Sequence, residues 1–271
     1  MAYQEILYEK DDKGLALITL NRPESLNAFT PTLLNEWLDA LQDAMYDHDV
    51  RVMMVTGAGR GFCSGANVRG FDQRGGAGAA ERPLEVFERR NPEPGTVHRF
   101  GRLLQFNYKP YIAAVNGPAA GGGMDSCNMA DVRLMSDAAR VGMRYIAMGI
   151  IPGDGGMYFL PRIIGLSRAL EWMWTGRMIG AEEALRVGWA NEVYPAEGFL
   201  DHAKEYAHNL CKQPAAGVQL IKRMAVGSVD LDRVTALEMS HMASVINSTS
   251  PDTREGPRAW VEKREPIFNA R

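Results

Sequence analysis

The sequence is poor in cysteine and contains no long apolar run. Its three cysteines, Cys63, Cys127 and Cys211, lack the paired spacing of a zinc site or a redox CxxC motif. We therefore expect reduced thiols in the cytoplasm, with no disulfide and no metal site. The longest apolar runs, such as residues 15–20, are too short to cross a bilayer. Residues 1–10 lack a basic segment followed by an apolar one, so neither secretion nor membrane association is predicted.

An excess of positive charge is also missing. The formal net charge is -3, from 30 Lys and Arg against 33 Asp and Glu. This balance argues against general nucleic-acid binding and leaves at most a local basic patch. What is present is an ordinary globular composition, with 46% apolar and 23% charged residues in a chain of 271. Such a chain can bury one large hydrophobic core.

Apolar patterning predicts an α/β core. Near-continuous apolar runs at residues 15–20 and 52–56 are typical of strands buried on both faces. Between them, apolar residues recur at helical spacing over residues 31–45. The same alternation leads from residues 111–115, through a glycine-rich turn and a short helix, to residues 132–135. Strand, helix and strand in this order predict crossover connections and a parallel sheet.

The pattern changes in the last part of the chain. We expect the α/β core to extend to about residue 190, because no convincing strand follows Gly198. Helical spacing of apolar residues covers three later segments, which are residues 199–211, 217–226 and 231–246. Residues 70–95 are rich in glycine, proline and charge, which predicts a loop inserted in the core with at most a short helix at residues 84–89.

Two glycine-containing turns follow apolar strands and precede helices. They span residues 57–68 and residues 116–125. Glycine lets the backbone approach a ligand closely, and free amides at a helix start can bind an anion. Each could equally be a plain tight turn. A phosphate-binding loop is less consistent with these segments, because the Gly-Lys-Ser/Thr ending and the GxGxxG pattern are both missing.

Taken together, these segments resemble the crotonase (enoyl-CoA hydratase/isomerase) family along nearly the whole chain. The matching segments are residues 18–23 with 26–28, 55–59, 62–67, 113–117, 121–123, 149–153 with 155–156, and 255–256 with 262–264. The resemblance implies an α/β fold with a spiral of ββα units and a C-terminal helical region. It implies an acyl-CoA-binding core over residues 1–195 and a helical trimerisation region over residues 196–271. It also implies a homotrimer or homohexamer that acts on acyl-CoA and needs no further cofactor.

The resemblance implies an oxyanion hole built from backbone amides. At the positions of Ala66 and Gly122, family members hold the thioester oxygen with the N–H group. An amide there would stabilise an enolate whatever the side chain. Contacts with CoA are implied at further positions, which are Ala28, Ala66, Asn67, Val68, Arg69 and Lys263. His98 is a weaker candidate beside the acyl pocket.

The acid and base positions depart from the family pattern. Where well-characterised hydratases of the family carry two glutamates, this chain carries Asp125 and Tyr145. A buried carboxyl can have its pKa raised toward neutrality, so Asp125 is a candidate acid or base, and Tyr145 a candidate donor. Local capping by Asp125 and ordinary packing of Tyr145 are the alternatives. Asp154 is either a second catalytic carboxylate or the N-cap of a helix.

Two classes of function follow from the resemblance. The first is hydration of an α,β-unsaturated acyl-CoA, with double-bond isomerisation or C–C hydrolysis through the same enolate as alternatives. The second is a non-catalytic acyl-CoA-binding protein, since one of the two glutamates has no carboxylate counterpart. Turnover of unsaturated thioesters separates the two classes.

Overall fold

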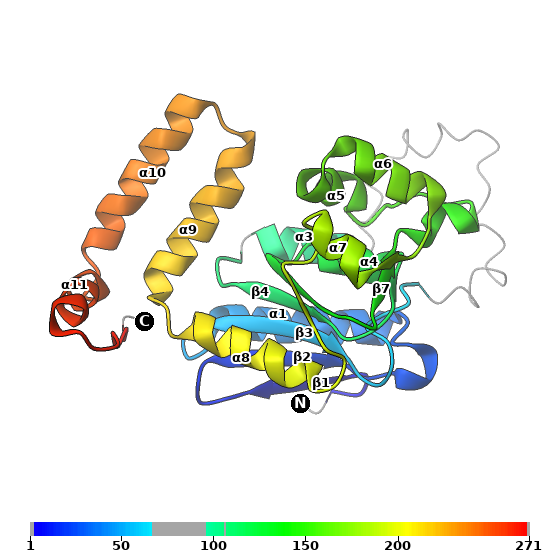
Figure 1. The fold of residues 1–271 in the computed structure, drawn as a ribbon, viewed down its shortest axis with the longest axis horizontal. Helices are drawn as coiled ribbons and strands as arrows, with labels where there is room; N and C mark the ends of the chain where they lie inside the picture. Colours follow the sequence, from blue (N-terminus) through cyan, green and yellow to red (C-terminus); the bar gives the residue numbers. More distant parts are fainter. Residues whose placement is uncertain (1–2, 67–95, 106, 270–271) are drawn as a thin grey trace.

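The computed structural model describes residues 3–66, 96–105 and 107–269. Within them, the main sheet has six strands in the order β1-β2-β3-β4-β6-β9 (Figure 1). These are β1 (Ile6–Lys10), β2 (Leu15–Leu20), β3 (Val52–Gly57), β4 (Tyr111–Val115), β6 (Val132–Ser136) and β9 (Glu192–Tyr194). Only β1 runs antiparallel to its neighbour. The predicted parallel sheet is confirmed.

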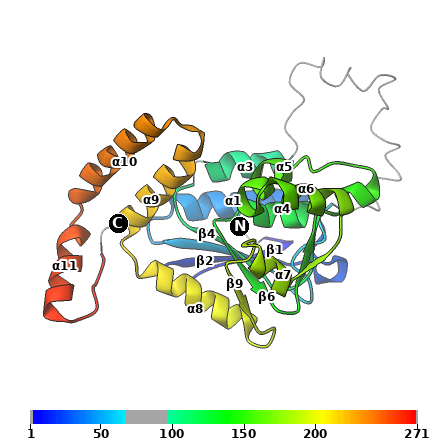
Figure 2. The ribbon, with the colours of Figure 1, turned by 45° about the horizontal axis from the view of Figure 1, so that its top comes forward.

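Both faces of this sheet are buried, which explains the continuous apolar runs. On β2, Ala16, Ile18 and Leu20 face one hydrophobic cluster, whereas Leu15 and Leu17 face the other. Helix α8 (Phe199–Cys211) covers the second face and buries Phe199, Ala203, Ala207 and Cys211 against it. Figures 1 and 2 show α8 alone on its side of the sheet, so the first helix of the C-terminal region packs on the core.

The other face of the sheet carries most of the remaining elements of the core. Helix α1 (Pro31–Tyr46) begins after Thr30, whose Oγ1 accepts a hydrogen bond of 3.0 Å from the Leu33 amide. The other helices of the core are α3 (Thr96–Gln105), α4 (Gly122–Asn128), α5 (Gly156–Ile164), α6 (Leu166–Thr175) and α7 (Ala181–Arg186), with short 3-10 turns η1 (Pro23–Ser25) and η5 (Arg144–Met148). A small second sheet joins β5 (Ala119–Ala120), β7 (Arg140–Gly142) and β8 (Ile179–Gly180).

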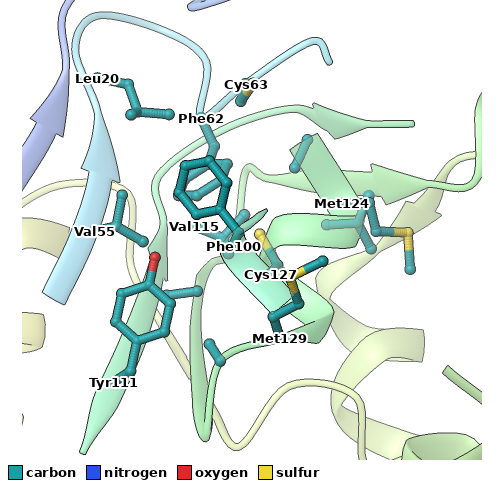
Figure 3. Close-up of a cluster of buried hydrophobic side chains, with 14 of the residues drawn as sticks. Leu20, Val55, Phe62, Cys63, Phe100, Tyr111, Val115, Met124, Cys127 and Met129 are labelled. Carbon is teal, nitrogen blue, oxygen red and sulfur yellow. The ribbon is translucent and has the colours of Figure 1, made fainter. Parts of the chain in front are cut away.

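Helix α4 is anchored to the sheet by its apolar side. Figure 3 shows Met124 and Cys127 of α4 in one cluster with Val55 and Val115 of the sheet and with Phe62. All five side chains are buried. This packing fixes the helix that carries Asp125.

The last helices leave the body of the molecule, as Figures 1 and 2 show. They are α9 (Ala215–Gly227), α10 (Arg233–Ser248) and α11 (Asp252–Glu262), with η6 (Ser228–Asp230) after α9. Lys222 ties α9 to the core through Nζ, which lies 2.6 Å from Asp131 Oδ2. The helices predicted in this region are confirmed, and α11 is an addition. None of the described helices is both long and apolar enough to span a membrane. The predicted loop at residues 70–95 lies outside the described residues.

Candidate active site

The two glycine-rich turns pack against each other at one end of the sheet. They follow β3 and β4, which are parallel neighbours, so both turns leave the same edge. The Ala120 amide donates a hydrogen bond of 3.0 Å to the Cys63 carbonyl oxygen. At Gly123, a Cβ atom would lie 2.1 Å from that same oxygen, so only glycine fits there. The backbones of the two turns are therefore in direct contact.

This packing brings together the segments of the two expected oxyanion amides. A Cβ atom on Gly65, which has φ +80, would lie 2.9 Å from the Gly122 nitrogen. Ala66 follows Gly65 and forms a parallel bridge with Phe29, whose amide donates to the Gly65 carbonyl at 2.8 Å. Gly122 is the first residue of α4, so its N–H has no acceptor within the helix. Ala28, buried beside Phe29, lies next to the first turn.

Three predicted side chains meet beside these turns. The Tyr145 hydroxyl oxygen lies 2.6 Å from Asp125 Oδ2 and 3.0 Å from Asp154 Oδ2. Asp125 comes from the first turn of α4, Tyr145 from η5, and Asp154 from the loop before α5. Asp154 Oδ2 also lies 3.6 Å from the position a Cβ atom on Gly122 would take. The trio therefore adjoins the second turn.

Burial sets the proton affinities of this trio. The Asp125 side chain is fully buried, and this desolvation raises the pKa of its carboxyl to about 7. The negative charge of Asp154 raises the same pKa, whereas hydrogen bonds from Tyr145, Asn128 and the Gly156 amide oppose the rise. Burial and the two carboxylates raise the pKa of Tyr145 above its ordinary value, so the phenol stays protonated. The site can therefore exchange a proton near neutral pH through Asp125.

The structure decides one of the alternatives for Asp154. The N-cap position of α5 is Gly155, with φ +110, and the amide of Gly156, the first residue of the helix, donates to the Asp125 carboxyl. The interpretation of Asp154 as an N-cap is therefore wrong. Asp125 accepts a hydrogen bond from the Tyr145 hydroxyl, which lies 20 residues further along the chain. Tyr145 therefore makes a specific hydrogen bond in addition to packing against its neighbours.

Sequence patterns did not predict the residues that contact Asp125 Oδ1, the oxygen not bonded to Tyr145. Asn128 Nδ2 lies 3.4 Å from Asp125 Oδ1, and its own Oδ1 accepts a hydrogen bond of 2.8 Å from the Trp189 indole N–H. Gly156 also lies against Asp125, since a Cβ atom on Gly156 would lie 2.2 Å from Asp125 Oδ1. Trp189 lies 61 residues beyond Asn128, so no local spacing joins them.

Lys263 is exposed at the end of α11, and Figures 1 and 2 show that α11 lies far from α4 in space. Asn67, Val68, Arg69 and the His98 side chain fall outside what the structure describes. The three cysteines are free and buried. Over the described ranges, no group of three His, Cys, Asp or Glu side chains is arranged to hold a metal ion.

Comparison with known proteins identifies the family. Residues 10–271 match the model of the enoyl-CoA hydratase/isomerase family. The chain belongs to this family and is therefore an enzyme of the crotonase fold.

Individual relatives cover essentially the whole chain. It is 34% identical to the 1,2-epoxyphenylacetyl-CoA isomerase of Escherichia coli K12, over 98% of this chain and 99% of that protein. It is 33% identical to the crotonyl-CoA hydratase of Syntrophomonas wolfei, over 99% of each. Among solved structures, the enoyl-CoA hydratase of Bacillus anthracis superposes with a TM-score of 0.86 at 30% identity, covering 98% of this chain and 99% of that one.

Proposed function

We propose that this enzyme hydrates an α,β-unsaturated acyl-CoA through an enolate held by the amides of Ala66 and Gly122. Tyr145 and the carboxyls of Asp125 and Asp154 would move the proton. The observation that carries this proposal is the Tyr145 hydroxyl, which bridges two carboxyls beside the second glycine turn.

The oxyanion hole is supported by the packing of the two turns. When water adds to the β-carbon, negative charge develops on the thioester oxygen. Two fixed amides stabilise that charge, and removal of one such donor costs roughly 3–4 kcal/mol in other enzymes. The close approach of the turns at Gly65 and Gly123 supports this pairing, since a Cβ atom on Gly65, the neighbour of Ala66, would lie 2.9 Å from the Gly122 nitrogen. Because the backbone N–H group would bind the thioester oxygen, Ala66 and Gly122 need no functional side chain.

The burial of the three side chains suggests a division of roles. Asp154 is partly exposed and adjoins Gly122, so we assign it the contact with water and substrate. Asp125 is fully buried, so we infer that it acts through the Tyr145 hydroxyl. This arrangement supplies two carboxyls, as hydration in the family requires, although Tyr145 occupies the place of the second glutamate.

Double-bond isomerisation is a second candidate. The relative from Escherichia coli is named an isomerase, at 34% identity over nearly the full length. A proton relay with one carboxyl facing the substrate could also return a proton to a different carbon of the same enolate. The two reactions share the oxyanion hole and differ in whether water is added.

The CoA moiety and the assembly are proposed from the family. We place CoA along Ala28, Ala66, Asn67, Val68 and Arg69. Lys263 is the C-cap residue of α11, and α11 lies far from α4 in its own chain (Figures 1 and 2), so a contribution of Lys263 to this site would come from a neighbouring subunit. Large exposed apolar side chains on α10 and α11, including Leu237 and Trp260, support a homotrimer or homohexamer.

The test is product analysis by mass spectrometry. Purified protein is incubated with crotonyl-CoA and with a panel of cyclic and dienoyl thioesters, with the Asp154→Asn variant as the control. Hydration adds the mass of one water, whereas isomerisation changes the retention time but not the mass. Turnover of no thioester by protein that still binds acyl-CoA would favour the non-catalytic alternative and overturn the proposal.

A further inference from the structure

We propose that Asn128, oriented by the Trp189 indole, is a positioning residue that holds the proton of Asp125 on the oxygen facing Tyr145. The inference rests on the proposed function, because it gives the proton relay its direction toward Asp154. It concerns a chain of five side chains, in the order Trp189, Asn128, Asp125, Tyr145 and Asp154.

The orientation of the Asn128 amide follows from the chemistry of its neighbour. An indole N–H can only donate, so the Asn128 atom 2.8 Å from Trp189 Nε1 must be the carbonyl oxygen. The amide nitrogen then points away from Trp189. It lies 3.4 Å from Asp125 Oδ1 and 3.9 Å from Met143 Sδ, and both of these atoms can accept. Trp189 thus removes the ambiguity of an amide flip.

This orientation makes the two oxygens of Asp125 different. Oδ1 faces the Asn128 amide nitrogen, and a Cβ atom on Gly156 would lie 2.2 Å from it, so Gly156 is on the same side. The Gly156 amide also donates to the carboxyl. An oxygen that faces two donors accepts them best as the unprotonated carbonyl oxygen, which favours the proton on Oδ2. Within the described part of the chain, the hydrogen-bond partner of Oδ2 is the Tyr145 hydroxyl.

The single hydrogen of the Tyr145 hydroxyl sets the direction of the proton relay. The Tyr145 hydroxyl has one hydrogen, yet its oxygen lies within hydrogen-bond distance of both Asp125 and Asp154. It can donate to only one of them at a time. When Asp125 is protonated on Oδ2, its proton fills the 2.6 Å contact and the tyrosine donates to Asp154. A proton given up by Asp125 then reaches Asp154 through one hydroxyl.

The titratable groups around Asp125 come from several elements. Tyr145 and Asp154 face it from η5 and from the loop before α5. The Cys127 thiol lies on the same helix, and Asp125 raises its pKa in addition to the larger effect of burial. Arg133 lies behind Trp189, where its Nε donates to the Trp189 carbonyl at 2.5 Å.

The test is a titration of the free protein, which needs no substrate. The aspartate carboxyls are labelled with carbon-13, and the Asp125 signal is identified in NMR spectra by its absence from Asp125→Asn. Trp189→Phe leaves Asn128 in place but frees its amide to turn, and Asn128→Leu removes the donor. Ser126→Ala is the control, because this serine is buried on the same helix and its hydroxyl donates to the Gly123 carbonyl.

We expect the titration midpoint of Asp125 to rise by about 0.5 to 1 pH unit in both test variants, because the carboxylate loses a donor. The midpoint should be unchanged in the control. Equal midpoints in wild type and both variants would overturn the inference. If one variant does not fold, the other decides. The pH profile of kcat is measured in parallel, with KM expected to stay constant. Shifted titrations without turnover of any thioester would count against the proposed function alone, and turnover with unshifted titrations against the inference alone.

Discussion

At the scale of single residues, the burial of Asp125 links the site to the stability of the fold. Burial raises the pKa of Asp125 from 3.8 to about 7. Between these pH values the unfolded chain has released the proton while the folded chain still holds it. This contribution to stability is therefore present below about pH 4 and is lost as the pH rises toward 7.

The variant Asp125→Asn should lack this loss. Since one pKa unit corresponds to about 1.4 kcal/mol, the wild type should lose up to about 4 kcal/mol relative to the variant between pH 4 and pH 8. Urea denaturation of both proteins across this range measures the difference, in which the contributions of carboxyls distant from Asp125 cancel. Parallel stability curves would show that Asp125 is ionised normally in the folded protein.

Gly156 offers a second residue-scale test. A Cβ atom there would lie 2.2 Å from Asp125 Oδ1 and 2.3 Å from Met143 Cε, so Gly156→Ala must displace both side chains or shift the start of α5. We expect a loss of about 1–3 kcal/mol in stability and a clear fall in kcat. Gly153→Ala is the matched control, because a Cβ atom there meets nothing within 4 Å. Similar behaviour of the two variants in thermal melts and kinetics would contradict the close packing at Gly156.

At the scale of elements, the sequence predicted the strands and helices that have a clear apolar pattern. The strands β2, β3, β4 and β6 and the helices α1 and α8 match their expected segments within a few residues. The second sheet escaped prediction because its strands are two or three residues long, too short for any alternation. Asp125, Tyr145 and Asp154 were predicted from the family resemblance. Asn128 and Trp189 were not, because their contact depends on the tertiary fold.

The exposed face of α10 leads to a prediction about assembly. Val234, Leu237 and Val245 recur on one side of this helix and are 54–65% exposed. We expect Leu237→Asp combined with Val245→Asp to shift a trimer or hexamer toward a monomer of 29.9 kDa in light scattering. Ser167→Asp, at an exposed position on α6, should leave the assembly intact. A wild-type protein that is already monomeric at micromolar concentration would contradict the proposed assembly.

At the scale of the whole molecule, ligand binding should stabilise the fold. A thioester that binds only the folded protein raises the melting temperature by mass action, with about 2.7 kcal/mol expected at 100 times Kd. We predict that crotonyl-CoA or another acyl-CoA at millimolar concentration raises the Tm in scanning fluorimetry, and that adenosine alone raises it less. No shift with any acyl-CoA would argue against the proposed binding site.

The central claim is that Asp125, Tyr145 and Asp154 act as one proton-transfer unit beside the oxyanion amides. It is tested most directly by single-turnover rates and thioester affinities for Asp125→Asn, Asp154→Asn and the double variant. We predict that each single variant slows chemistry by at least about 100-fold, the lower end for loss of a general acid or base, with binding nearly unchanged. Because the residues act as a unit, the double variant should be slowed about as much as the slower single variant. Wild-type turnover in Asp154→Asn, or losses that multiply in the double variant, would contradict the claim.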